Sequence, residues 1–227
     1  MSDYNAEDVR NIALVGHAGA GKTTLVEALL AATGAIPQPG RVDKGTTVCD
    51  FDPLEKELMH SLDVGITSFN SAGKHVNLID TPGFPDFIGR SINVLPAVET
   101  AAVVINAEAG IEPVTQRMMK AAANRNLCRI VIVNQIDAPG VDLAAVTAQI
   151  RETFGPECLP INLPADHGRR VIDCFFQPSG ERPDFSSVAD AHGQIVDQVV
   201  EVDEALMEIY LEQGSELQPE QLHDPFE

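Results

Sequence analysis

Along the first 155 residues, the pattern of apolar and polar positions predicts strands that alternate with helices, which is typical of α/β domains. Short apolar runs predict strands, and one alternating segment followed by a turn at 70–74 predicts the first arm of a hairpin. The expected strands are 11–15, 62–66, 75–79, 100–106 and 129–133. The last two are apolar throughout, which indicates strands buried in a parallel sheet. The expected helices are 24–30, 113–123 and 142–153, with Pro113 in the first turn of one and Asp142 as the N-cap of another.

The pattern changes at Gly155 and Pro156. Residues 156–192 contain many prolines and two short apolar pieces, 159–163 and 170–176, and helical spacing follows over 193–211. We therefore predict a three-layer α/β core with a mostly parallel sheet over 1–155, and a small α+β subdomain with an acidic helix and tail over 156–227.

Composition narrows the class of protein. There are 34 Asp and Glu against 15 Lys and Arg, a net charge of −19, which argues against direct binding of DNA by this chain. No apolar run is long enough to span a membrane, and the acidic N-terminus is unlike a secretory signal. The four cysteines form no C-x-x-C pair, which favours reduced thiols in a cytoplasmic protein. We expect a monomer.

Residues 16–23, GHAGAGKT, fit the phosphate-loop pattern G-x-x-x-x-G-K-[ST] between an expected strand and an expected helix. Glycines let the backbone N–H groups turn inward around a phosphate, and the helix N-terminus adds partial positive charge. Lys22 would reach the outer phosphates, and the Thr23 hydroxyl would bind Mg²⁺. The remaining residues expected to contact the nucleotide here are His17, Ala18, Gly19, Ala20, Gly21 and Thr24.

Two further motifs end expected strands. In 80–83, DTPG, the Asp80 carboxylate can hold Mg²⁺ through water and the Gly83 N–H can meet a terminal phosphate. In 134–137, NQID, Asp137 can accept two hydrogen bonds from guanine N1 and N2, which adenine cannot offer. Asn134 would connect this loop to the phosphate loop. Together the motifs predict GTP or GDP with Mg²⁺ as ligands, and they disfavour an ATPase.

With these motifs, the chain resembles the GTPase domain of translational GTPases of the elongation factor G class, including the elongation factor G-like proteins. The similarity covers nearly the whole chain. It includes 16–30, 51–61, 76–89 and 134–137, and also the family's inserted subdomain, which ends in a family-specific segment at 203–211. It implies a GTP-hydrolysing switch of protein biosynthesis that acts at the ribosome through a longer protein. It also implies that the family's closing strand and helix are missing here, so we expect an excised part of that protein.

The resemblance also marks departures. The family's Mg²⁺-binding switch residue is Ser61 or Thr67, and we favour Ser61 because it lies 19 residues before Asp80, which leaves room for two strands and a turn.

Phe84 stands where the family has a water-positioning histidine, so the catalytic group is unknown and we expect slow intrinsic hydrolysis. Gln135 replaces a lysine that stacks on guanine in the family, and this change predicts weaker binding of the nucleotide. We expect His17 and His60 to be surface or loop histidines.

Two alternatives remain open at this stage. Phe84 and Gln135 also fit a nucleotide-binding regulatory module with little or no GTPase activity. The resemblance does not distinguish translocation from ribosome protection or another ribosomal role.

Overall fold

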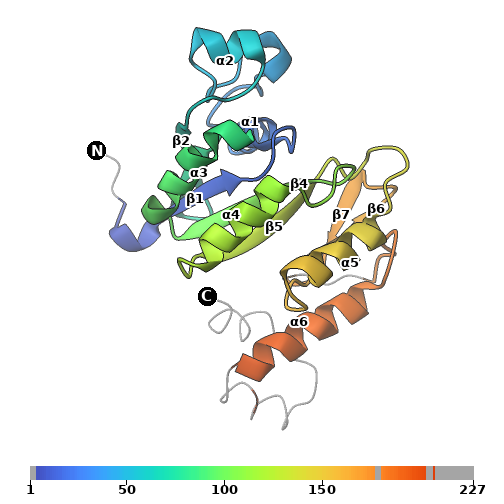
Figure 1. Ribbon diagram of the computed structural model, residues 1–227. Coiled ribbons are helices and arrows are strands. Elements are labelled where there is room, and N and C mark those ends of the chain that lie inside the picture. Colours follow the sequence, from blue (N-terminus) through green and yellow to red (C-terminus); the bar gives the residue numbers. More distant parts are fainter. Residues whose placement is uncertain (1–3, 177–179, 203–206, 208–227) are drawn as a thin grey trace. The chain divides into compact units, whose positions relative to one another are not determined.

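The computed structural model describes residues 4–176, 180–202 and 207 (Figure 1). The chain divides into two compact units, Met1–Gln135 and Ile136–Glu227, and each is described by itself. The domain boundary expected near residue 155 stays a prediction. Within the described ranges, we find no helix with the length and apolarity needed to cross a membrane.

The first unit is built on one five-stranded sheet, in the order β2-β3-β1-β4-β5. The strands are β1 (Val9–Val15), β2 (Gly65–Ser71), β3 (Lys74–Asp80), β4 (Thr100–Asn106) and β5 (Cys128–Asn134). All neighbours are parallel except β2 and β3, which form an antiparallel hairpin. The mostly parallel α/β sheet is therefore confirmed. The hairpin is confirmed too, but its first arm begins at Gly65 rather than at residue 62.

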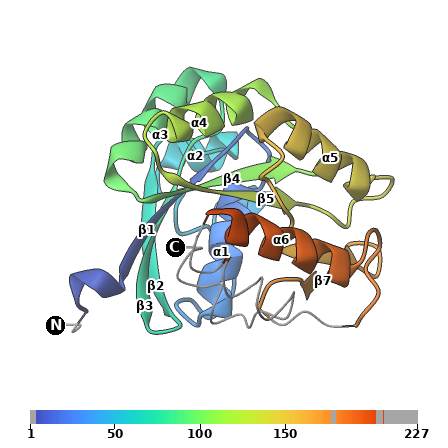
Figure 2. The same cartoon turned by 90° about the horizontal axis from the view of Figure 1, so that it is seen from below.

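The α-helices in the described part of this unit are α1 (Lys22–Ala32), α2 (Pro53–Leu58), α3 (Ile88–Val94) and α4 (Pro113–Ala123). Figure 2 shows α1 on one face of the sheet and α3 and α4 on the other. The apolar face of α1 packs on the sheet through Val26 and Leu30, which contact a core that includes Leu14, Leu78 and Val104. This layer fixes the loop between β1 and α1 at the carboxyl end of the strands, where open α/β sheets bind ligands.

The strands β4 and β5 differ in how deeply they are buried. Five consecutive residues of β4 are buried, as its apolar sequence predicted. In the described part of the chain β5 lies at the edge of the sheet, and its seven residues are exposed or half-buried. The expectation of a buried strand at 129–133 is therefore wrong, because a strand with a neighbour on one side only keeps more of its surface exposed.

The second unit contains α5 (Leu143–Phe154), an antiparallel pair of β6 (Asn162–Ala165) and β7 (Arg170–Asp173), and α6 (Val188–Val202). Asp142 caps α5, as expected, by accepting from the Ala145 N–H at 3.0 Å. The last helix begins five residues before the expected position 193, because the Ser187 hydroxyl accepts from the Asp190 N–H and caps it there. The family-specific segment 203–211, apart from Met207, and the tail lie outside the described residues.

The buried Glu27 carboxylate connects α1 to the irregular segment 33–52. Its oxygens accept from the Gly40 N–H at 2.7 Å and the Val48 N–H at 2.5 Å. Glu27→Gln places an amide donor against one of these N–H donors, so we expect the free energy of unfolding to fall by about 2 kcal/mol. Urea denaturation would measure this. Glu152→Gln, a change at an exposed position of α5, is the control and should change stability by no more than about 0.5 kcal/mol. Equal stabilities for the two variants would contradict the prediction.

Candidate functional site

The loop between β1 and α1 has the backbone that its glycines allow. Gly16, Gly19 and Gly21 have positive φ angles of 141°, 82° and 86°. A side chain at Gly16 would place a Cβ in collision with the Val104 carbonyl oxygen, so the loop is also too close to β4 for any other residue. The loop then enters α1 directly at Lys22. This arrangement is the one that the phosphate-loop pattern predicted.

Lys22 is buried, with 6% of its surface exposed. Its ammonium donates to the backbone carbonyls of Gly16, at 3.0 Å, and His17, at 2.8 Å. Burial lowers the pKa of Lys22 to about 8, although the negative charge of Asp80 acts to raise it. The ammonium is therefore a desolvated cation inside the loop, which a phosphate would stabilise.

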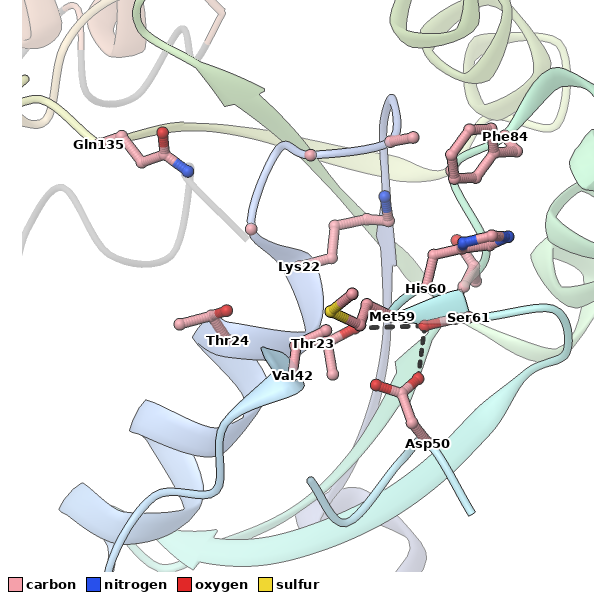
Figure 3. Close-up of a pocket in the computed structure, with 15 residues that line it drawn as sticks. Lys22, Thr23, Thr24, Val42, Asp50, Met59, His60, Ser61, Phe84 and Gln135 are labelled. Atoms are coloured by element: carbon pink, nitrogen blue, oxygen red, sulfur yellow. Dashed lines mark hydrogen bonds between the residues drawn. The ribbon is translucent and has the colours of Figure 1, made fainter. Parts of the chain in front are cut away.

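Hydroxyl and carboxylate oxygens gather at the start of α1. Thr23 Oγ1 donates to Asp80 Oδ2 at 2.5 Å and lies 3.3 Å from Ser61 Oγ. Ser61 Oγ donates in turn to Asp50 Oδ1 at 2.7 Å (Figure 3). Thr67 lies within β2 opposite Leu78 and does not line this cavity. The structure thus brings Ser61, rather than Thr67, to Thr23.

The Asp80 carboxyl is almost completely buried, with 1% of the residue exposed. Burial raises its pKa to about 6. Among the described residues its Oδ1 atom has no hydrogen-bond partner, although Oδ2 accepts from Thr23. A buried oxygen without a partner, beside two hydroxyls and the Asp50 carboxylate, is an oxygen donor set of the kind that Mg²⁺ prefers.

Asp50 is a site residue that sequence reasoning missed. It is buried, and its second oxygen accepts from Thr47 Oγ1 at 2.9 Å. The only signal in the sequence was an acidic residue two positions before the Asp52 cap of α2, inside a segment with no regular pattern. Its approach to Ser61 depends on how that segment folds back over α1.

Burial of Asp80 predicts a pH dependence of stability in the absence of Mg²⁺. Its pKa is about 6 in the folded chain, against an ordinary value of 3.8. Between these values the folded chain binds more protons than the unfolded chain, so stability falls as the pH rises. Asp80 contributes about 3 kcal/mol at most to the free energy of unfolding. This contribution is complete below the pKa of Asp80 in the unfolded chain and is lost above its pKa in the folded chain.

Urea unfolding in EDTA, from about pH 4 to about pH 7, would measure this change. Asp80→Asn removes the titrating group and keeps an acceptor for Thr23, so its stability should vary less over the same range. Parallel pH profiles for the parent and this variant would show that other carboxyl groups cause the effect.

Gly83 lies against the phosphate loop. A Cβ at this position would be 2.5 Å from Lys22 Nζ and 2.6 Å from the Ala18 backbone nitrogen. The side chain of the next residue, Phe84, is 37% exposed and its ring lies 4.4 Å from the His60 ring. A cavity of about 250 Å³ lies among these residues. It is lined by Ala18, Gly19, Gly21, Lys22, Thr23, Thr24, Val42, Asp50, Met59, His60, Ser61, Thr81, Gly83, Phe84 and Gln135.

Asn134 connects the end of β5 to the phosphate loop, because its Nδ2 donates to the Ala20 carbonyl at 2.9 Å. The next residue, Gln135, has a left-handed backbone with a φ of 57°. Its Oε1 accepts from Asn106 Nδ2 at 2.8 Å, a contact that the sequence did not predict. Asp137 belongs to the second unit, and its role in base recognition stays a prediction.

His17 lies in the loop between β1 and α1, as expected of a surface or loop histidine, but it is not at the surface. Only 1% of it is exposed, and its Nδ1 lies 3.0 Å from Thr115 Oγ1 on α4. Burial lowers its pKa. The phosphate loop turns this side chain inward against α4, whereas neighbouring residues of the loop line the cavity.

The chain matches one family model and several known proteins. Residues 7–219 match the family model described as the elongation factor Tu GTP binding domain. The chain is 35% identical over 217 residues to the elongation factor G-like protein of Mycobacterium tuberculosis, covering 89% of this chain and 30% of that protein. It is 40% identical over 156 residues to elongation factor G 2 of Streptomyces coelicolor, covering 69% of this chain and 23% of that protein.

Among solved structures, a crystal structure of a protein from Thermus thermophilus matches with a TM-score of 0.84 and 38% identity. The match covers 96% of this chain and 35% of that one. The chain therefore spans about a third or less of the length of these relatives.

Proposed function

This chain belongs to the elongation factor Tu GTP-binding domain family, as a GTP-binding domain of the elongation factor G-like translational GTPases, and we propose that it hydrolyses GTP in a Mg²⁺-dependent manner. One observation carries the proposal. Lys22, Thr23, Ser61 and Gly83 line a single cavity of about 250 Å³, and each provides a group that a nucleoside triphosphate with Mg²⁺ requires.

The phosphates would contact the loop backbone from His17 to Thr24 and the Lys22 ammonium. Lys22 already donates to two loop carbonyls, and its partly desolvated charge favours a phosphate partner. Gly83 would donate its N–H to the terminal phosphate, which its closeness to Lys22 Nζ supports. This contact would distinguish GTP from GDP.

Mg²⁺ would be held by Thr23 and Ser61, with Asp80 binding through water. When bound, the ion neutralises charge that develops on the phosphates during transfer. Two observations support this assignment. Asp80 Oδ1 has no hydrogen-bond partner in the described part of the chain, and hydrogen bonds run from Thr23 through Ser61 to Asp50. Asp50 would hold the Ser61 hydroxyl in place.

Guanine would be recognised by Asp137, with Asn134 supporting the loop and Gln135 packing beside the base. The hydrogen bond from Asn134 to Ala20 supports this arrangement. The longer protein would act at the ribosome in the cytoplasm, with residues 1–155 as the nucleotide-binding core and 156–227 as an inserted subdomain. These statements about the whole protein rest on relatives that are about three times longer than this chain.

Displacement of a fluorescent GDP analogue by unlabelled GTP, GDP and ATP, with Mg²⁺ present, tests nucleotide identity. We expect displacement by both guanine nucleotides and none by ATP at equal concentration. Equal displacement by ATP would contradict the role of Asp137 and Asn134. Release of inorganic phosphate from GTP by an excess of the chain then tests hydrolysis, and its absence with intact binding would contradict the hydrolytic part of the proposal.

A further inference from the structure

His60 takes a position at the cavity that its place in the sequence did not indicate. It follows α2, whose last turn ends at Met59 with a left-handed backbone, φ 54°. The His60 N–H donates to the Glu55 carbonyl at 3.2 Å, which closes this turn. The chain therefore reverses at Met59, and His60 becomes a half-buried residue that lines the cavity next to Ser61.

The His60 ring lies beside the ring of Phe84, with centroids 4.4 Å apart and planes tilted by 50° (Figure 3). Phe84 directly follows Gly83, whose backbone abuts Lys22. His60 and Phe84 thus line the same cavity as Gly83 and Ser61, which are proposed to meet the terminal phosphate and Mg²⁺. The Phe84 side chain is a hydrocarbon, so it can orient the His60 ring but cannot itself hydrogen-bond water.

One hydrogen bond determines which His60 nitrogen can accept. His60 Nδ1 lies 2.9 Å from the Leu58 carbonyl oxygen. A carbonyl oxygen only accepts, so Nδ1 must carry a proton in this contact. In the neutral ring Nε2 is then the acceptor. Within the described residues Nε2 makes no hydrogen bond.

The other histidine near the phosphate loop does not compete for this role. His17 is buried against Thr115, and its side chain does not line the cavity. Of the described histidines, only His60 lines the cavity that contains Lys22 and Thr23.

We propose that His60 is the catalytic residue that orients the attacking water, with its Nε2 accepting a hydrogen bond from that water and Phe84 holding the ring; this inference rests on the proposed GTPase function. The water oxygen forms a bond to the γ-phosphorus as the bond from that phosphorus to the β–γ bridging oxygen breaks. The bridging oxygen leaves with the electron pair as part of GDP. Of the two water protons, one stays on the inorganic phosphate and the other passes to solvent. His60 keeps its own protonation state.

The test compares His60→Ala with His60→Gln in single-turnover GTP hydrolysis with Mg²⁺, using an excess of the whole 227-residue chain. Affinity for a fluorescent GDP analogue is measured in parallel. We expect His60→Ala to slow hydrolysis at least about tenfold, with the GDP affinity unchanged within about twofold. His60→Gln should restore part of the rate, because a carboxamide oxygen can also accept from water.

His75→Ala is the matched control. His75 lies in β3, stacks on Tyr4 and does not line the cavity, so its rate and affinity should equal those of the parent. A second variant keeps the test informative if alanine disturbs the turn after Met59. Adding Phe84→His to His60→Ala supplies an imidazole from the neighbouring ring position, and the rate should rise above that of His60→Ala alone.

Parent-like hydrolysis by His60→Ala would overturn the inference. Equal losses of rate and GDP affinity in both His60 variants would also overturn it, because they would indicate a purely structural role. If the parent chain binds GDP but does not hydrolyse GTP, the hydrolytic part of the proposed function fails first, and that outcome is distinguished by the parent measurement alone.

Discussion

Lys22→Met is expected to weaken binding of both GTP and GDP by about 100-fold. The ammonium is the one buried cation of the phosphate loop, with 6% of the residue exposed. Methionine keeps the length and apolar stem of the side chain and removes the charge. Loss of charge-assisted hydrogen bonds to phosphate costs about 3 kcal/mol, which corresponds to this factor. Titration with the fluorescent GDP analogue, and competition by GTP, would measure it.

The same variant should fold as stably as the parent when no nucleotide is present. The lost hydrogen bonds to the Gly16 and His17 carbonyls are offset by removal of a charge whose pKa is lowered by burial to about 8. We expect the free energies of unfolding to agree within about 1 kcal/mol. Lys120→Met, at an exposed position of α4, is the control and should bind like the parent. Full nucleotide affinity in Lys22→Met would contradict the assignment of the phosphate site.

Gly83→Ala is expected to separate GTP from GDP. The new Cβ would lie 2.5 Å from Lys22 Nζ and 2.6 Å from the Ala18 backbone nitrogen. Because the phosphate-loop backbone cannot yield easily, the segment after β3 must move away from the terminal phosphate. Loss of one hydrogen bond to a charged phosphate predicts about a tenfold or greater fall in affinity for GTP, with GDP affinity changed by less than about threefold.

Gly89→Ala is the matched control for this glycine. Gly89 lies in α3, and a Cβ there would meet no atom within 4 Å. It should leave both affinities unchanged and stabilise the helix by about 0.5 kcal/mol or more. Competition of GTP and GDP against the fluorescent analogue measures the ratio. A parallel fall for both nucleotides in Gly83→Ala would show damage to the whole loop instead of a contact to the terminal phosphate.

The residues whose roles follow from local chemistry were predicted from the sequence. The turn from β1 into α1 needs Gly16, Gly19 and Gly21, because their positive φ angles strain other residues. Lys22 and Thr23 follow that turn at the helix start, so their positions follow from the chain itself. The helix at Pro113–Ala123 and the cap at Asp142 were predicted for the same reason, since a proline and an N-cap act on the residues next to them.

Residues that meet across long sequence separations were decided by the tertiary structure. Ser61 reaches Thr23, 38 positions earlier, only because the segment 33–64 folds back over α1, and the same fold brings in Asp50. His17 and His60 looked alike in the sequence, but packing against α4 buries the first and the turn at Met59 exposes the second to the cavity. The sequence by itself thus determined the phosphate loop and the family, because local backbone and side-chain chemistry carry them. Only the tertiary structure decided which side chains complete the site, because their contacts depend on the packing of segments that are distant along the chain.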